Sequence, residues 1–439
     1  MGIKVAKFGG SSVADGIQLR KIKDIIEADS DRKYIVVSAP GKRYDGDNKI
    51  TDLLYLCGTH MEHNLPYDQL LQVVTDRFMA VKVNLGVDVD IDGEFAVIRE
   101  NMRKGCSADY LASRGEYLNA LLVAAFLGYD FVDTAGLIKF DGKGRLLLEE
   151  TDEALRAELA SHERAVIPGF YGTNAETGRV RTFSRGGSDI TGALVARAVK
   201  ADIYENWTDV SGFLKADPRI VAGAKPISRI SYKELRELSY MGASVLHEDA
   251  IYPAKLANIP INIRNTNAPD DMGTIITAEH EGGADDVITG IAGKKDFTVI
   301  AIYKNMMSNE RGFVRRILTI MEDFDVDFEH IPSGIDTVSV VVDTQQLNGN
   351  RDDLMEAFER QLNPDSMEVF DDIALIATVG CGMSRRHGVS AALFTALAEA
   401  EVNIRMIDQG SSEINIIVGV ENKDFEKAIR AIYDAFEGK

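Results

Sequence analysis

Two glycine-rich turns in this chain have the residue types that bind anions. The first runs from Lys7 to Ser12 and contains Gly9, Gly10 and Ser11. Adjacent glycines let the main chain approach an anion closely, and the amides at the beginning of a helix carry partial positive charge. Lys7 adds a full positive charge. An ordinary β–α turn with a surface lysine has the same pattern, so this turn alone leaves both interpretations open.

The second turn carries charged residues on both sides of its glycines. Gly186, Gly187 and Ser188 lie between Arg185 and Asp189. A guanidinium suits bidentate capture of a carboxylate, and the amides of the turn could face a phosphoryl group during transfer. Asp189 could orient a lysine or a water bound to magnesium. A capped helix whose N-terminal carboxylate favours the helix dipole would explain the same residues, but two such turns in one chain favour anion binding.

Further candidates lie between and beyond the turns. Glu116 belongs to an otherwise apolar helical stretch, which allows burial beside a substrate ammonium, although a lone glutamate in a helix is usually solvated. Ser38 and Thr51 precede it. The run from Thr208 to Arg219 follows a strand and joins turn-forming residues to Lys215, which is moderately specific for a loop that faces a nucleotide.

No nucleophilic triad or metal site is predicted. His60 and His63 have no third ligand nearby, and the three cysteines are far apart and form no C-x-x-C pair. Phosphoryl transfer to a carboxylate fits this pattern, because a carboxylate is already ionised at neutral pH and needs no general base. The protein has to position the reactants and neutralise charge, with Mg²⁺ bridging phosphates.

The elements that position these residues alternate between strands and helices. Residues 3–8 read as a strand, 17–26 as a helix and 34–39 as a nearly all-apolar strand. This alternation continues over about the first 290 residues and predicts an α/β domain with a parallel or mixed sheet covered by helices. Residues 40–49 are polar, basic and rich in glycine, which predicts a mobile loop that could act as a lid.

The tail repeats itself. Ile300, Gly312 and Gly334 recur as residues 376, 388 and 410, and every pair is 76 residues apart. Each copy reads as a βαββαβ unit. The predicted domains are therefore 1–290, 291–370 and 371–439, with the acidic residues 279–286 as the junction.

The amino-acid composition limits the classes of function that the chain can have. The 439 residues are 45% hydrophobic and 27% charged, as in a globular protein, and the formal net charge is −20. Such a charge disfavours nucleic acid and anionic membranes as partners. The start of the chain has no apolar signal core, and the longest apolar stretch, 120–127, is too short to span a membrane. A cytoplasmic location is expected.

Together the motifs resemble those of aspartate kinases (aspartokinases) over nearly the whole chain. They are the two glycine turns, Val37-Ser-Ala39, Ser113-Arg-Gly-Glu116, Gly169-Phe170, Trp207-Thr-Asp-Val210, Asp217-Pro-Arg219 and the segment from Met241 to His247. The tail resembles the tandem ACT domains that regulate these enzymes. The resemblance implies the amino-acid-kinase fold and conversion of ATP and L-aspartate to 4-phospho-L-aspartate and ADP, the entry step to lysine, threonine and methionine.

The resemblance also implies roles for individual residues. Lys7 would stabilise the transferring phosphoryl group, and Asp189 would organise that lysine. Arg185 would hold the α-carboxylate of aspartate, and Glu116 its ammonium. The rest of the aspartate pocket would be Ser38, Thr51, Phe170 and Ser188. ATP would contact Lys7, Gly9, Gly10, Ser11, Thr208, Asp209, Leu214, Lys215 and Arg219, and Mg²⁺ would bind through the ATP phosphates, with no metal site made by the protein alone.

The sequence departs from the family at two places. Ser244 stands where many relatives have a lysine that touches nucleotide phosphate, and Lys215 is the candidate replacement. Residues 40–49 form a longer loop than is usual, which affects the placement of Thr51.

The ACT units imply an amino-acid effector. The effector residues expected in the first unit are Met307, Phe313, Val314, Phe328, Glu329 and Ser333, with the alternative that they only form the core and dimer interface. L-lysine is the expected inhibitor, and threonine or another end product is the alternative. Pairing of ACT units predicts a homodimer or homotetramer.

Two other functions stay open at this point. One is another amino-acid kinase, acting on glutamate, N-acetylglutamate or a nucleoside monophosphate. The other is a non-catalytic amino-acid-binding regulator with a degenerate kinase domain.

Overall fold

The computed structural model describes residues 2–184, 186–243, 246, 248–279 and 287–438, with the backbone alone for residues 248 and 249. The chain folds into two compact units. The first contains residues 1–213, 226–232 and 245–280, and the second contains 214–225, 233–244 and 281–439. Within the described ranges, no helix combines the length and the apolar character that a membrane span requires.

The first unit is built on an eight-stranded sheet in the order β3-β5-β2-β1-β8-β10-β11-β9. Every neighbouring pair is parallel except β10 and β11. This confirms the predicted, mostly parallel central sheet. The strands are β1 (Lys4–Phe8), β2 (Arg32–Val37), β3 (Asp130–Phe131), β5 (Ala165–Pro168), β8 (Ile203–Thr208), β9 (Arg229–Ser231), β10 (Ile261–Asn265) and β11 (Thr274–Thr277), with a small second sheet of β4 (Lys139–Phe140), β6 (Tyr171–Asn174) and β7 (Val180–Thr182).

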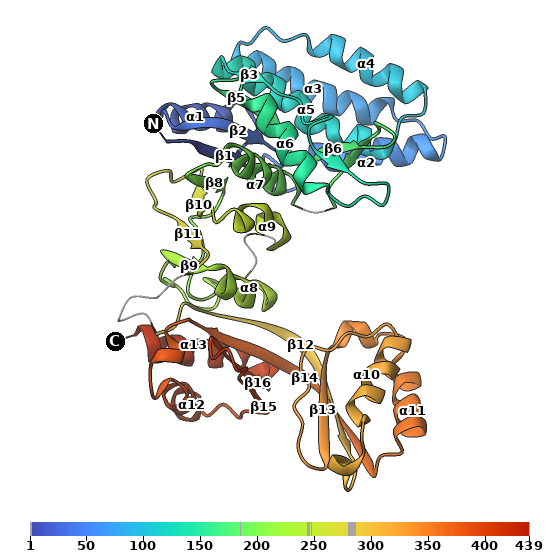
Figure 1. Cartoon of the computed structure of the whole chain (residues 1–439), viewed down its shortest axis with the longest axis vertical. Coiled ribbons are helices and arrows are strands. Elements are labelled where there is room, and N and C mark those ends of the chain that lie inside the picture. Colours follow the sequence, from blue (N-terminus) through green and yellow to red (C-terminus); the bar gives the residue numbers. More distant parts are fainter. Residues whose placement is uncertain (1, 185, 244–245, 247, 280–286, 439) are drawn as a thin grey trace. The chain divides into compact units, whose positions relative to one another are not determined.

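Helices α2 to α5 lie side by side in one layer of this unit (Figure 1). Their ends follow local rules, since Ser107 caps the start of α5 through its hydroxyl and left-handed Gly128 ends it. The helices of the unit are α1 (Gly16–Glu27), α2 (Ile50–Glu62), α3 (Asp68–Leu85), α4 (Ile91–Arg103), α5 (Ala108–Leu127), α6 (Leu148–Leu159), α7 (Gly187–Val199) and α9 (Glu248–Leu256).

The centre of the sheet is fully enclosed. Phe8, Ile35, Val37 and Trp207 are all buried, and the rings of Phe8 and Trp207 stack with their centroids 5.9 Å apart. Burial on both faces explains why these strands are almost continuously apolar. The carboxyl ends of β1 and β2 therefore project from a rigid core, and the first glycine turn starts there.

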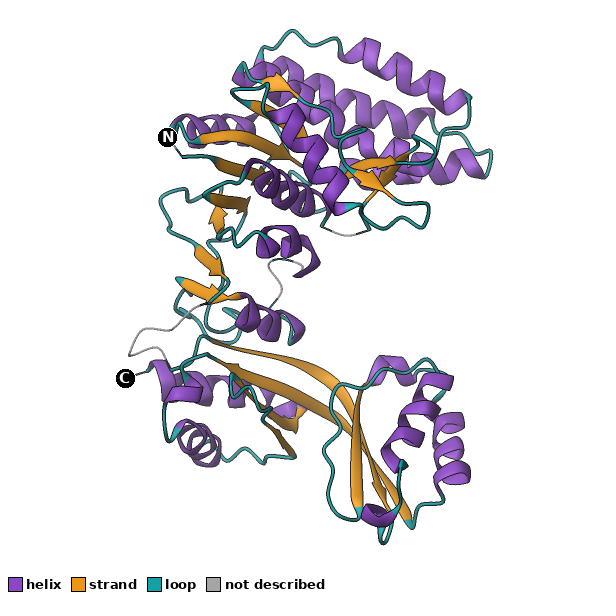
Figure 2. Ribbon diagram, viewed as in Figure 1, coloured by secondary structure: helices purple, strands orange, loops and turns teal. Residues whose placement is uncertain are grey.

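The second unit holds a five-stranded antiparallel sheet in the order β13-β12-β14-β16-β15 (Figure 2). Its strands are β12 (Gly290–Tyr303), β13 (Thr337–Asp343), β14 (Ser366–Val379), β15 (Met406–Asp408) and β16 (Asn415–Glu421), and its helices are α8 (Tyr232–Tyr240), α10 (Phe313–Asp323), α11 (Arg351–Leu362), α12 (Val389–Glu399) and α13 (Phe425–Glu437).

The two repeat copies share their longest strands. Residues 290–294 of β12 pair with 375–379 of β14, and residues 297–303 pair with 366–373. Residues 290–294, which precede the first copy in the sequence, thus supply a strand to the second copy. Between the two halves, Asp296 and Asp372 adopt left-handed backbone angles of φ 69° and 59°. The predicted boundary at 370/371 falls inside β14, and the three-domain division stays a prediction.

Two short segments from the middle of the chain belong to this second unit. Ala216 and Val221 are buried in the same core as α13. In α8, the fully buried carboxylate of Glu234 accepts hydrogen bonds from Thr289 Oγ1, at 2.5 Å, and from the amide of Cys381, at 2.8 Å. Residues 214–225 and α8 therefore pack against the unit that contains the five-stranded sheet.

Candidate active site

Lys7 stands at the centre of a buried polar network at the end of β1. Its ammonium lies 2.5 Å from Asp189 Oδ1 and 3.5 Å from Asn206 Oδ1, and Asn206 Nδ2 donates to the same Asp189 oxygen at 2.8 Å. The lysine is only 6% exposed. The two predicted catalytic residues Lys7 and Asp189 thus meet, although 182 positions separate them in the sequence.

The first glycine turn is fixed on both sides by the main chain. The amide of Gly9 donates to the carbonyl of Trp207 at 3.0 Å, and the amide of Gly41 donates to the carbonyl of Gly10 at 2.8 Å. A Cβ at Gly41 would lie 2.6 Å from the carbonyl carbon of Gly10. The turn and the loop after β2 therefore touch backbone to backbone, which only a glycine at position 41 permits.

A cavity of about 700 Å³ opens beside this turn. Its polar and charged lining comes from the turn, the loop after β2, α2, α5 and the segment after β8. Six predicted site residues line it: Gly10, Ser11, Ser38, Thr51, Glu116 and Asp209. The loop residues Lys42, Arg43 and Lys49 line it as well, which concentrates positive charge in a strongly acidic protein.

Glu116 presents a buried carboxylate to this cavity. Among the described residues, its Oε2 has no hydrogen-bond partner. Burial raises the pKa of Glu116 to about 8, while a backbone hydrogen bond from Ala39 and the charge of Arg114 act in the opposite direction. A buried carboxylate with an unused oxygen suits a cationic group of a ligand, because an ammonium would supply both the missing hydrogen bond and the opposite charge.

The second glycine turn is partly described. Arg185, the predicted carboxylate-binding residue, lies outside the described residues. A Cβ at Gly169 would lie 2.6 Å from Ser188 Oγ, and one at Gly187 would lie 2.6 Å from Phe170 Cδ2, so the turn at 169–170 packs on the start of α7. Phe170 has φ 80°, and its amide donates to Thr191 Oγ1 at 3.1 Å. A bulky residue held in the left-handed region is typical of functional sites.

The predicted nucleotide contacts divide between the two units. Thr208 and Asp209 belong to the first unit, where the Thr208 hydroxyl lies 3.2 Å from Asp209 Oδ1. The other three, Leu214, Lys215 and Arg219, belong to the second unit. There Lys215 Nζ lies 2.6 Å from Glu437 Oε1, and the exposed Arg219 pairs with Asp217. Ser244 lies outside the described residues.

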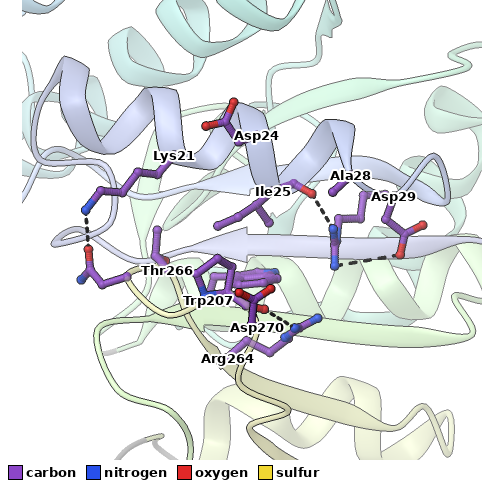
Figure 3. A pocket seen from close by; sticks show the side chains of 12 residues that line it. Lys21, Asp24, Ile25, Ala28, Asp29, Trp207, Arg264, Thr266 and Asp270 are labelled. Carbon is purple, nitrogen blue, oxygen red and sulfur yellow. Dashed lines mark hydrogen bonds and ion pairs between the residues drawn. The ribbon is translucent and has the colours of Figure 1, made fainter.

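A second cavity of about 410 Å³ lies between α1 and the segment after β10 (Figure 3). Its cations already have partners: Lys21 donates to Asn267 at 2.8 Å, Arg32 to Glu205 at 2.7 Å and Arg264 to the carbonyl of Pro269 at 2.6 Å. None of the predicted site residues lines it. The cavity at the glycine turn is therefore the candidate active site.

Sequence reasoning missed Asn206 and Asn119. Asn119 is fully buried in α5 and its Nδ2 donates to the carbonyl of Ser38 at 2.7 Å, which holds the pocket residue in place. A polar side chain inside an apolar strand or helix was the available signal, because such a group needs a buried partner. The sequence does not say which partner that is.

Comparison with known proteins identifies the family. A family model described as the amino acid kinase family matches residues 2–265, and an ACT domain model matches residues 376–436. Aspartokinase 3 of Bacillus subtilis is 38% identical, over 99% of this chain and 98% of its own length. The chain belongs to the aspartokinase family.

Solved aspartokinase structures support the fold over the whole length. The crystal structure of the Clostridium acetobutylicum aspartate kinase has a TM-score of 0.94, with 52% identity and full coverage of both chains. Escherichia coli aspartokinase III, at 26% identity and 99% coverage of both chains, has a TM-score of 0.74 in complex with aspartate and ADP and 0.75 with lysine and aspartate.

In the aspartokinase tail, the residues expected to bind an effector have different surroundings. Met307 and Phe313 are buried in the core of the first ACT unit, with Val314 packed against it, whereas Phe328 is 47% exposed. Glu329 accepts a hydrogen bond from the hydroxyl of Tyr240 at the end of α8. Ser333 forms an isolated antiparallel β-bridge with Val338 of β13.

Proposed function

We propose that this protein transfers the γ-phosphoryl group of ATP to the side-chain carboxylate of L-aspartate, giving 4-phospho-L-aspartate and ADP. The observation that carries the proposal is the buried carboxylate of Glu116, a residue that lines the cavity at the first glycine turn and has one oxygen without a hydrogen-bond partner among the described residues. The cavity thus offers a place for an ammonium and a place for phosphates side by side. The aspartokinase relatives support the same reaction.

Four of the predicted residues have a defined task in this proposal. Glu116 binds the ammonium of aspartate, and Arg185 binds its α-carboxylate. The side-chain carboxylate is the nucleophile and is already ionised, so no general base acts on it. Lys7, held by Asp189 and Asn206, stabilises the negative charge on the oxygens of the phosphoryl group as it passes between acceptor and ADP.

Mg²⁺ is proposed to arrive on the phosphates of ATP. Among the described residues, no group of three His, Cys, Asp or Glu side chains is arranged to hold an ion, and a metal carried by the nucleotide fits that donor set. When bound, it neutralises phosphate charge. The chain's own contribution is to orient the two anions and hold Lys7 between them.

L-lysine is proposed as the inhibitor, bound at the first ACT unit. E. coli aspartokinase III was solved with lysine and aspartate in its T-state, and Glu329 offers a carboxylate to an ammonium. Pairing of ACT units would make a homodimer or homotetramer. Exposed Met306, Phe328 and Ile335 in this unit supply apolar surface for such pairing.

The decisive measurement is ADP release with ATP, magnesium and either aspartate or glutamate. Aspartate-dependent turnover that L-lysine lowers, and that threonine and methionine do not, is the expected result. Turnover with glutamate alone would point to another amino-acid kinase. Absence of turnover with every acceptor, together with amino-acid binding, would point to a regulator.

A further inference from the structure

One acidic side chain in the loop after β2 is buried although the loop is not. Residues 42–46 are exposed, yet the side chain of Asp47 is only 8% exposed. Arg43 donates to it through its main-chain amide and its guanidinium, at 2.8 to 3.0 Å. These hydrogen bonds, together with the charge of Arg77, hold the pKa of Asp47 well below its usual range.

Arg77 reaches the loop from α3 and is itself buried, at 7% exposure. Its Nη1 donates to Asp47 Oδ2 at 2.8 Å. Its Nη2 donates to the carbonyl of Gly41 at 2.6 Å and to the carbonyl of Ala14 at 3.2 Å. One guanidinium thus binds Asp47 within the loop, Gly41 at the beginning of the loop and Ala14 just after the first glycine turn.

One of these attachment points, Gly41, lines the cavity. Gly41 touches the phosphate-cradling turn directly, through its amide hydrogen bond to Gly10. Between Gly41 and Asp47 lie the residues that form one wall of the cavity. In the described part of the chain, Lys42 and Lys49 have no ion pair with an acidic side chain, so their charges remain available to an anion in the cavity.

We propose that Arg77, with Asp47 as its counter-charge, is a positioning residue that holds the loop 41–49 against the first glycine turn and so presents Lys42 and Lys49 to the anionic reactants. It touches no reactant itself. The inference rests on the proposed function for the identity of those reactants.

A buried arginine can also serve stability alone, so the test needs a measurement that stability does not control. Lys42, Arg43 and Lys49 are the trypsin sites of this loop. In Arg77→Met and Asp47→Asn we expect trypsin cleavage at Lys42 and Arg43 to accelerate at least tenfold. We also expect kcat/KM to fall by up to about 10²-fold, which is the loss that misplacing a reactant by about 1 Å can cause. The loss in the double variant should be smaller than the sum of the two single losses, because both changes open the contact between Arg77 and Asp47.

Thr75→Val is the matched control. Thr75 is buried on the same helix, and its hydroxyl donates only to the carbonyl of Leu71 within that helix. It should change neither loop cleavage nor kinetics. If Arg77→Met does not fold, Asp47→Asn tests the same contact from the exposed loop.

The two proposals fail in different ways. Lack of aspartate-dependent turnover in the wild-type protein would count against the proposed function, whereas loop cleavage and ADP affinity by calorimetry do not depend on the acceptor. Wild-type loop cleavage and wild-type ADP affinity in both single variants would overturn the role of Arg77. Equal defects in Thr75→Val, or additive losses in the double variant, would overturn it too.

Discussion

At the scale of single residues, Lys7 is a buried cation that two polar side chains hold in place. Its ammonium is buried between Asp189 and Asn206, so its position is set before any anion arrives. A fixed charge of this kind stabilises a transition state more than a mobile one, because no reorganisation is needed during the reaction.

Lys7→Met is expected to lower kcat by about 10² to 10³-fold, the usual loss when one preorganised donor to a reacting oxygen is removed. Steady-state ADP release measures it. Lys4→Met is the matched control, since Lys4 lies on the same strand but forms a partly exposed pair with Asp29. A Lys7 variant with wild-type kcat would show that this lysine does not face the phosphoryl group.

Glu116 gives the reaction a pH dependence whose sign follows from its raised pKa of about 8. In the free enzyme this carboxyl is protonated below that pH, and only the charged form pairs with an ammonium. We expect kcat/KM for aspartate to rise with pH by up to tenfold per unit and to level off above about 8.

The same group also affects stability. The pKa of Glu116 in the folded protein lies above its ordinary value of 4.5. Its contribution to the free energy of unfolding is therefore complete below pH 4.5 and is lost as the pH rises through about 8. Glu116→Gln should flatten both the rate profile and this loss of thermal stability. Glu100→Gln, at an exposed position on α4, should alter neither. A profile unchanged by Glu116→Gln would assign the titration to another group.

At the scale of elements, the segment 214–225 is bound to α13 through buried charge. The side chains of Lys215 and Glu437 are 12% and 10% exposed, and Lys225 also pairs with Glu437. This arrangement uses Lys215 for structure, although the sequence suggested it as a nucleotide contact.

Glu437→Gln should therefore destabilise the second unit by up to about 3 kcal/mol, because it removes the negative charge opposite a largely buried cation. Thermal unfolding followed by circular dichroism measures the change. In Glu426→Gln, which breaks an exposed pair with Arg430 on the same helix, about 0.5 kcal/mol or less is expected. Similar losses in the two variants would show that burial does not strengthen the Lys215 contact.

The sequence predicted the elements better than their partners. The glycine turns, the apolar strands and the 76-residue repeat were all readable, because residue type and periodicity reflect the local backbone and its burial. Three long-range contacts could not be predicted, because each depends on which distant segment satisfies a buried group. They are the contact of Lys7 with Asn206, the pairing of Gly290–Lys294 with the second ACT copy and the packing of Val221 near α13. The Arg77 contact was missed for the same reason, since a lone arginine in a helix carries no spacing signal.

At the scale of the whole molecule, the sequence contains one tryptophan, Trp207, and it is buried in the first unit. Its emission reports unfolding of that unit, whereas circular dichroism reports both. Saturating L-lysine should shift the dichroism transition of the second unit by about 2.7 kcal/mol at a hundredfold excess over Kd, and the tryptophan transition by less.

The control ligand for this experiment is L-aspartate, which should shift the tryptophan transition more than the dichroism transition of the second unit. Denaturant titrations with both probes make the comparison. If lysine shifted only the tryptophan transition, the effector would bind in the kinase unit and the ACT assignment would be wrong.

The shared strands β12 and β14 limit how the tail can bend. Both run through the two ACT copies, and their pairing shifts register between Lys294 and Phe297 and again between Phe297 and Val299, beside Asp296 and Asp372, whose backbones are left-handed. Asn422 holds Asp296 at this point through a hydrogen bond of 2.8 Å to its carboxylate. A change of angle between the copies is therefore expected at residues 295–298 and 371–372, because the pairs on either side of this stretch are held in a continuous ladder.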